Sequence, residues 1–253
     1  MIAFLAHIVR SCGSSFVYFH CFRNTGMTRG CVTSRRWFCL MAECVKPFDS
    51  VYHSLESILS FLKSPKYLEI NEVQRLLEIF EQNYDQDAAK SMEHLHPFIV
   101  FEGLDGSGKT TTIKKLMKKI SARQMSTPPE CLMVLRTWFD VQPAQLRRAY
   151  YSLGNYIVGQ SVEKTLQAGP VLMDRFWNST AAYAIADEVR DKNIPLPPAG
   201  DPLYQWPSDL TKPDKVLFLD VCEKIRLNRH SGRNTTNTNE EQQLANEAAY
   251  RQK

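Results

Sequence analysis

From residue 98 onward, short apolar runs alternate with longer stretches whose apolar positions recur at helical spacing. The runs predict buried strands at residues 98–102, 132–136, 171–174 and 216–220. The stretches between them predict helices at about 108–122, 143–168, 177–191 and 222–231. Alternation of this kind is typical of a parallel sheet that is covered by helices on both faces, so the pattern predicts an α/β fold of three layers.

Residues 43–96 carry a different pattern, that of two amphipathic helices. The first helix is expected to be capped by Asp49 or Ser50. Its apolar stripe consists of Val51, Leu55, Ile58, Leu59 and Leu62. The stripe of the second helix consists of Ile70, Val73, Leu76, Leu77 and Phe80. No cluster of catalytic side chains accompanies these helices, so we expect a small structural appendage.

Residues 103–110 read Gly-Leu-Asp-Gly-Ser-Gly-Lys-Thr and fit the P-loop pattern G-x-x-x-x-G-K-[ST]. The motif lies between a predicted strand and a predicted helix, where glycines let backbone N–H groups curl around a phosphate chain. Lys109 is then expected to reach the outer phosphates, and the Thr110 hydroxyl to be placed for Mg²⁺. The expected nucleotide-binding residues are Gly103, Leu104, Asp105, Gly106, Ser107, Gly108, Lys109, Thr110 and Thr111.

The chain of 253 residues has a formal net charge of +4, and the excess positive charge lies at its N-terminal end. Residues 1–42 hold five arginines, no lysine and no acidic residue, whereas the rest of the chain holds 26 basic and 27 acidic residues. The α/β part therefore lacks the basic surplus that is typical of nucleic-acid binding. No apolar run approaches the roughly 20 residues that span a bilayer, so no transmembrane segment is expected.

The arginine-containing, acid-free composition of residues 1–42 is typical of a mitochondrial transit peptide. Two alternatives stay open, namely a disordered tail without a targeting function and a secretory signal whose apolar core would be residues 1–9. Five of the seven cysteines lie within residues 12–44, and no C-x-x-C pair or Cys/His group has the spacing of zinc ligands. We expect a mitochondrial protein.

A P-loop identifies a nucleotide-binding protein without specifying its reaction. In parallel sheets, ligands bind beyond the carboxyl ends of the strands, and polar residues follow the predicted strands at this position. These residues are Glu102, Arg136, Asp174 and Asp220. We therefore expect the reaction site at this edge of the sheet.

The segment FEGLDGSGKTT at residues 101–111, together with Asp-Arg-Phe at residues 174–176, resembles the thymidylate kinase family. The segments YSLGNY at residues 151–156 and YQWP at residues 204–207 are similar to a branch of that family that phosphorylates UMP and CMP in mitochondria. The resemblance runs from about residue 97 to residue 253. It implies a P-loop kinase fold, ATP as the phosphoryl donor and Mg²⁺ as the cofactor.

The resemblance also assigns roles on the acceptor side. It implies that Asp105 touches the acceptor nucleotide, that Arg136 clamps the acceptor phosphate, and that Arg175 lies between the two reacting phosphates. A guanidinium fork suits a phosphate, which agrees with the roles of the two arginines. Tyr151 is implied to stack on the pyrimidine and Tyr183 to pack against the sugar.

On the donor side, the resemblance implies that Asp174 joins Thr110 around Mg²⁺ or its waters. A lid after the last predicted helix is implied to close over the ATP phosphates with Arg229 and Arg233. Together with Lys109 and Arg175, these two arginines are the expected catalytic residues.

Other arginines near these positions have less certain assignments. Charged residues are often merely solvated, so Arg226 is expected on the surface of its helix. For Arg147 and Arg148 two alternatives stay open, namely a position on the surface and a contact with the substrate.

One position departs from the pattern of thymidylate kinases. These enzymes carry an arginine four residues after the stacking aromatic, where it donates to O4 of thymine, and this chain has Asn155 there. An amide both donates and accepts hydrogen bonds, so it can serve either the uracil O4 or the cytosine amino group. The residue favours UMP and CMP over dTMP as acceptors.

The expected activity is transfer of the γ-phosphoryl group of ATP to UMP, CMP or dCMP, a step of pyrimidine nucleotide biosynthesis. The alternatives are a thymidylate kinase, a deoxynucleoside kinase with Glu102 as its base, and a nucleotide-binding variant without activity. The expected partners are ATP and pyrimidine nucleoside monophosphates, and a homodimer is one possible assembly.

The expected organisation is a transit peptide at residues 1–42, a helical extension at 43–96 and a kinase domain at 97–253. The kinase domain is expected to be incomplete at its C-terminal end, because the chain ends soon after the lid and no fifth strand follows. One edge of a sheet of four strands would then be bare, and a bare edge favours aggregation.

Overall fold

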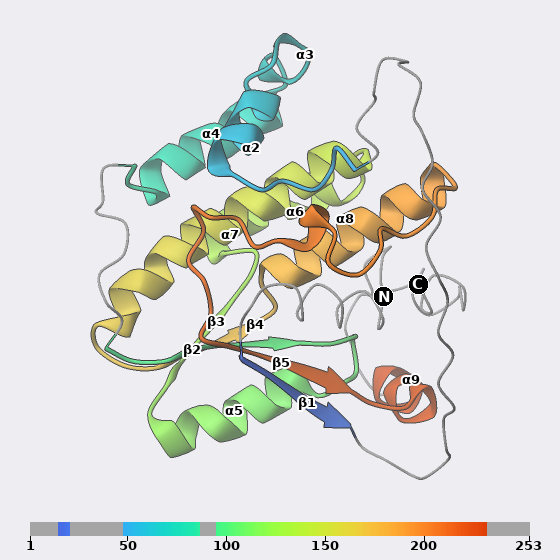
Figure 1. Cartoon of the computed structure of the whole chain (residues 1–253). Coiled ribbons are helices and arrows are strands. Elements are labelled where there is room, and N and C mark those ends of the chain that lie inside the picture. Colours follow the sequence, from blue (N-terminus) through green and yellow to red (C-terminus); the bar gives the residue numbers. More distant parts are fainter. Residues whose placement is uncertain (1–14, 21–47, 87–94, 232–253) are drawn as a thin grey trace.

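The computed structural model describes residues 15–20, 48–86 and 95–231, and its centre is a five-stranded parallel sheet (Figure 1). The strand order is β1-β5-β2-β4-β3. The strands are β1 (Ser15–His20), β2 (Phe98–Glu102), β3 (Arg123–Ser126), β4 (Val171–Asp174) and β5 (Lys215–Asp220). Helix α5 (Lys109–Ile120) covers one face, and α7 (Ala144–Leu166) and α8 (Trp177–Asp191) cover the other. The three-layer α/β prediction is confirmed.

The central strand β2 supplies side chains to both faces of the sheet. Phe98 and Val100 belong to the large core beneath α7 and α8. Phe101 belongs to a smaller core beneath α5, together with Ile113 and Leu172. This alternation follows from the period of two along a strand. It fixes the register of β2, and so the place of the P-loop that begins at its end.

The helical extension forms a hairpin of α2 (Leu55–Leu62), α3 (Pro65–Leu68) and α4 (Asn71–Asn83), which packs on α7 (Figure 1). The predicted stripes provide the buried residues of the two longer helices. These are Ile58, Leu62, Val73, Leu76, Leu77 and Phe80. The predicted cap is wrong, because the Ser54 side chain accepts from the Ser57 N–H. Ser50 instead donates to Glu188 on α8, from its backbone N–H at 2.7 Å and from its hydroxyl.

The prediction of a strand at residues 132–136 is wrong. This segment contains the end of a 3₁₀ turn (Glu130–Leu132) and the first half of helix α6 (Met133–Asp140). The buried side chains of this turn and helix are Leu132, Leu135 and Phe139. They recur at intervals of three and four residues, which is helical spacing. The strand between α5 and α6 is β3, which lies at the sheet edge and has a polar sequence without an apolar run.

The sequence predicted a sheet of four strands, and the structure adds a fifth, β1. Strand β1 pairs with β5 in parallel over six residues, from Ser15 opposite Lys215 to His20 opposite Asp220. Strand β1 therefore covers β5, which would otherwise be an edge strand. It lies inside the segment whose composition predicts a transit peptide, so removal of residues 1–42 would also remove this strand.

The chain beyond α8 returns to the sheet by an irregular path that contains a 3₁₀ turn (Pro202–Tyr204) before β5. Helix α9 (Glu223–Ser231) follows β5 and lies beside the end of the sheet at which the P-loop begins (Figure 1). Within the described residues, the helices are too short or too polar to cross a membrane.

Candidate active site

The P-loop connects β2 to α5 and adopts backbone angles that suit glycine. Gly103 and Gly106 have φ angles of +141° and +81°. A Cβ on Gly103 would lie 2.5 Å from the carbonyl oxygen of Leu219 in β5, and one on Gly106 would lie 2.8 Å from the carbonyl oxygen of Arg226 in α9. Both positions therefore require glycine for conformation and for space.

Lys109 begins α5 and is 6% exposed. Its Nζ donates to the carbonyl oxygens of Gly103 at 2.9 Å and Leu104 at 3.2 Å, which folds the side chain back over the loop. Burial, and to a lesser degree the charge of Arg175, lowers the pKa of Lys109 from 10.5 to about 8. The amine is thus mainly protonated near neutral pH and is placed within the phosphate cradle.

Thr110 and Asp174 lie together, as expected for a magnesium site. The Thr110 hydroxyl donates to Oδ2 of Asp174, at the end of β4. A hydroxyl and a carboxylate are the oxygen ligands that Mg²⁺ takes in phosphoryl-transfer sites, where waters and phosphates complete its shell. The two side chains therefore fit this cation. Thr111, which follows in α5, is exposed.

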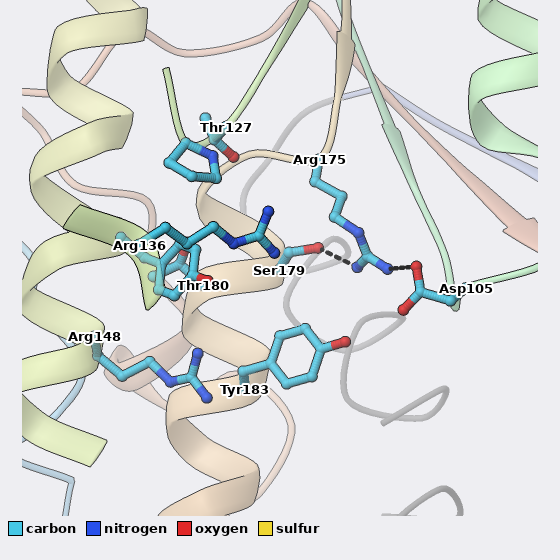
Figure 2. Close-up of a pocket in the computed structure, with 10 residues that line it drawn as sticks. Asp105, Thr127, Arg136, Arg148, Arg175, Ser179, Thr180 and Tyr183 are labelled. Atoms are coloured by element: carbon cyan, nitrogen blue, oxygen red, sulfur yellow. Dashed lines mark hydrogen bonds and ion pairs between the residues drawn. The ribbon is translucent and has the colours of Figure 1, made fainter. Parts of the chain in front are cut away.

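Arg175 follows β4 and joins the P-loop to α8. It has a φ angle of +65°, which is unusual for a residue with a side chain. Its Nη2 lies 2.7 Å from Oδ1 of Asp105, and its Nη1 donates to the Ser179 hydroxyl at 3.1 Å (Figure 2). Burial alone would lower the pKa of Arg175, but Asp105, Tyr183 and Glu102 raise it well above the usual value. The guanidinium is therefore a fixed positive charge.

Glu102 lies behind Arg175 and is fully buried. One carboxylate oxygen accepts from the backbone N–H groups of Phe176 at 3.0 Å and Ser179 at 3.3 Å, and the other accepts from the Ser179 hydroxyl. Burial raises the pKa of the Glu102 carboxyl. Both oxygens thus bind the first turn of α8, and Ser179 links Glu102 to Arg175. This arrangement argues against Glu102 as a base that faces a substrate.

An open pocket extends from the P-loop between α6, α7 and α8 (Figure 2). Its walls bring together side chains from six separate parts of the chain. They are Asp105, Thr127, Pro128, Arg136, Arg148, Tyr151, Arg175, Ser179, Thr180 and Tyr183. Asp105, Arg136, Tyr151, Arg175 and Tyr183 are the residues that the family resemblance places around the acceptor and its phosphate. The pocket and the P-loop meet at the ion pair of Asp105 with Arg175.

Arg136 reaches the pocket from helix α6 and not from a strand end as expected. Its Nε lies 3.4 Å from Oδ2 of Asp140, one turn later in the same helix. Oδ1 of Asp140 accepts from the hydroxyl of Tyr151. The carboxylate therefore orients both the arginine and the tyrosine, although no sequence motif singles out Asp140.

Asn155 is fully buried and is not among the residues that line the pocket. Its Nδ2 donates to the hydroxyl of Thr180 at 3.1 Å, and Thr180 lines the pocket. The amide oxygen of Asn155 has no hydrogen-bond partner. The expected reader of the base thus lies one layer behind the wall and contacts the wall through Thr180.

Helix α9 packs on the P-loop through two arginines. Arg229 donates from Nη1 to the carbonyl oxygens of Gly106 at 3.2 Å and Ser107 at 3.3 Å. Arg226 is 4% exposed and donates to the carbonyl oxygen of Asp105 at 3.4 Å, so its expected place on the surface is wrong. Arg233 lies outside the described residues.

Sequence reasoning did not select several residues of this site, among them Ser179, Thr180 and Asp187. Asp187 is fully buried in α8 and pairs with Arg148 and Arg147. The available signal was the pair of acidic side chains, Asp187 and Glu188, among the otherwise apolar or aromatic residues 181–189, because a buried carboxylate requires a partner.

Comparison with known proteins identifies the family. A family model described as thymidylate kinase matches residues 101–253. The chain belongs to the thymidylate kinase family. The fold is accordingly that of a P-loop NTPase.

Individual relatives agree with this family. The chain is 46% identical over 155 residues to human mitochondrial UMP-CMP kinase 2, over 61% of this chain and 34% of that protein. It thus spans about a third of that relative's length. It is 29% identical over 148 residues to thymidylate kinase of Leptospira borgpetersenii, over 54% of this chain and 69% of that one.

A solved thymidylate kinase of Candida albicans is 23% identical, with a TM-score of 0.43 over 55% of this chain and 68% of that chain. This likeness is too slight to add to the assignment.

Proposed function

We propose that the protein transfers the γ-phosphoryl group of ATP to the phosphate of UMP, CMP or dCMP. The observation that carries this proposal is the junction of the P-loop with an arginine-lined pocket at Asp105 and Arg175, 2.7 Å apart. A donor phosphate chain in the P-loop and an acceptor phosphate in the pocket would meet at this point. Phosphoryl transfer needs this alignment and positive charge, and little covalent help from the protein.

The chain's own residues supply the charge. Lys109 is held over the P-loop, Arg175 lies between the loop and the pocket, and Arg229 approaches from α9. Thr110 and Asp174 would hold Mg²⁺, which neutralises charge on the donor phosphates when it is bound. The acceptor phosphate is itself a nucleophile, so this reaction needs no strong base. In the proposed mechanism, closure of α9 with Arg229 and Arg233 excludes water.

The preference for UMP and CMP rests on the base side of the pocket. Tyr151 offers an aromatic face, and Asn155 stands where thymidylate kinases carry an arginine that reads thymine. The amide acts through Thr180, whose hydroxyl both donates and accepts. The relative named UMP-CMP kinase 2 supports this acceptor class, whereas the relatives named thymidylate kinase make dTMP the second candidate.

An acceptor panel tests this proposal. The full chain would be assayed with ATP and Mg²⁺ against UMP, CMP, dTMP and deoxycytidine, and kcat/KM would be compared. We expect turnover of UMP and CMP to exceed that of dTMP, and no turnover of deoxycytidine. A preference for dTMP would make the protein a thymidylate kinase, and phosphorylation of deoxycytidine would contradict the assignment to monophosphate acceptors.

A mitochondrial location is a further part of the proposal. It is supported by the five arginines and the absence of acidic residues in residues 1–42 and by the mitochondrial relative. A fluorescent reporter fused to residues 1–42 should accumulate in mitochondria. A diffuse signal, or a signal in the secretory pathway, would contradict this location.

A further inference from the structure

Arg148 is a buried arginine in the wall of the acceptor pocket, and neither the P-loop nor the Asp-Arg-Phe motif accounts for it. It lies on α7, is 2% exposed and lines the pocket. Figure 2 shows its side chain directed toward Tyr183, on the side of the pocket away from Asp105 and Arg175. The arginine therefore lies where an acceptor nucleotide would extend beyond its phosphate.

Arg148 is held in place by two neighbours on α8. Its Nη2 lies 2.7 Å from Oδ2 of Asp187, and its guanidinium carbon lies 5.2 Å from the centre of the Tyr183 ring. Burial alone would raise the pKa of Asp187, but Arg148 and Arg147 lower it below the usual value. Asp187 is thus an anion that fixes the plane of the Arg148 guanidinium.

A buried, charged arginine costs folding free energy, so its presence calls for a functional explanation. Removing a guanidinium and a carboxylate from water costs free energy, and their mutual attraction offsets little more than this cost. Apolar side chains of similar size would pack at least as well. A guanidinium that is fixed by a carboxylate presents its N–H donors in a defined plane, which suits recognition of oxygen atoms. The place of this pair at a pocket wall therefore favours a role in binding.

The spacing along α8 indicates which part of the ligand Arg148 meets. Ser179 contacts Arg175 at the phosphate end, and Asp187 contacts Arg148. These two α8 residues are eight positions apart, which is about 12 Å along a helix axis. A nucleotide whose phosphate lies at Arg175 would thus bring its nucleoside part to Arg148.

We propose that Arg148 donates hydrogen bonds to an oxygen atom of the nucleoside part of the acceptor, on the sugar or on the pyrimidine ring. Asp187 acts as a positioning residue for it. This inference rests on the proposed function, because the acceptor is taken to be a pyrimidine nucleoside monophosphate. It adds a contact that would recognise the acceptor independently of Asn155.

Arg147 provides a matched control. It pairs with the same carboxylate oxygen of Asp187 at 2.9 Å but is not among the residues that line the pocket. The variants Arg148→Met and Arg147→Met each remove one ion pair with Asp187, and only the first changes the pocket wall. The full chain and both variants would be titrated with CMP, dCMP, ribose 5-phosphate and ATP by calorimetry, and their melting temperatures would be measured.

We expect Arg148→Met to weaken CMP binding about tenfold or more, as usual for a lost hydrogen bond from a charged group, and to leave ATP binding unchanged. Arg147→Met should bind CMP within about twofold of the wild type. If the contact is to the 2′-hydroxyl, dCMP will be less affected than CMP. If it is to the base, CMP and dCMP will weaken alike, and ribose 5-phosphate will not.

A second pair of variants covers the case in which Arg148→Met does not fold. Arg148→Lys keeps the charge beside Asp187 but loses the planar fork, and it should also weaken CMP binding. Asp187→Asn should raise KM for CMP while leaving KM for ATP unchanged, which a general loss of stability would not do.

The proposal is overturned if Arg148→Met or Arg148→Lys binds CMP as the wild type does. It is also overturned if Arg147→Met weakens CMP binding as much as Arg148→Met does. A wild-type chain that binds CMP but transfers no phosphate would contradict the proposed function, and the comparison of variants would still decide the role of Arg148. A chain that binds no pyrimidine monophosphate would contradict both.

Discussion

At the scale of single residues, the site depends on charges whose states are fixed by burial and by neighbours. Lys109 and Arg175 illustrate a lowered and a raised pKa. Burial lowers the pKa of Lys109 to about 8, whereas nearby acidic groups and Tyr183 hold the pKa of Arg175 well above its usual value. The lysine is therefore sensitive to pH in the range of ordinary assays, and the arginine is not.

This difference predicts how ATP binding depends on pH. A phosphate chain favours the protonated amine, so affinity should be constant below about pH 8 and fall as the pH rises through the pKa of Lys109. The Lys109→Arg variant stays charged throughout this pH range, so its affinity for ATP should not change with pH. Calorimetric titration with ATP from pH 6.5 to 10 would measure both, and parallel profiles would contradict the assignment of Lys109 to the phosphates.

Ser179 gives a second prediction at this scale. Its hydroxyl links Glu102 to Arg175, so Ser179→Ala should release Arg175 and lower kcat for CMP by roughly 10- to 100-fold, the range for a hydrogen bond to a charged group. Ser161→Ala is a control, because its hydroxyl donates to the Ile157 carbonyl within α7. An unchanged kcat for Ser179→Ala, even with a lower melting temperature, would show that the link has no role in catalysis.

At the scale of elements, sequence patterns predicted the elements that are strongly apolar or strongly periodic. Strands β2 and β4 are apolar runs, and helices α5 and α8 carry apolar positions at helical spacing. Strand β3 escaped prediction because an edge strand of sequence Arg-Gln-Met-Ser has no apolar signal. The apolar residues at the start of helix α6 are close together in the sequence, so their pattern predicts a strand.

The candidate site shows the same division. The P-loop and the Asp-Arg-Phe segment could be read from the sequence because each is a contiguous motif. Asp140 and Asp187 could not, because their roles depend on contacts with Arg136 and Arg148 that only the tertiary structure creates.

Strand β1 gives the prediction at this scale. Deletion of residues 1–42 removes β1 and exposes the edge of β5, whereas deletion of residues 1–14 keeps β1. At about 1 kcal/mol per hydrogen bond and about 2–4 °C per kcal/mol for a protein of this size, the longer deletion should lower Tm by roughly 10 °C or more. Thermal unfolding of the three chains would measure this, and equal Tm values would mean that β1 does not stabilise the sheet.

At the scale of the whole molecule, the sheet brings the P-loop and the arginine-lined pocket together. Strands β2 and β4 are neighbours, so the P-loop after β2 and Arg175 after β4 emerge side by side. Helices α6, α7 and α8 then contribute the walls of the arginine-lined pocket at this junction, and α9 contacts the P-loop through Arg229. The helical extension packs on α7 and α6, and its buried apolar residues belong to the large core.

The most direct test of this account is to follow the transferred group. The 253-residue chain would be incubated with ATP labelled in its γ-phosphate, Mg²⁺ and CMP, and the nucleotide products would be separated. The account predicts labelled CDP, formed in proportion to loss of labelled ATP and abolished by Lys109→Ala. Labelled inorganic phosphate without labelled CDP, or labelled CDP at the same rate from Lys109→Ala, would contradict the claim that the P-loop and the arginine pocket form one phosphoryl-transfer site.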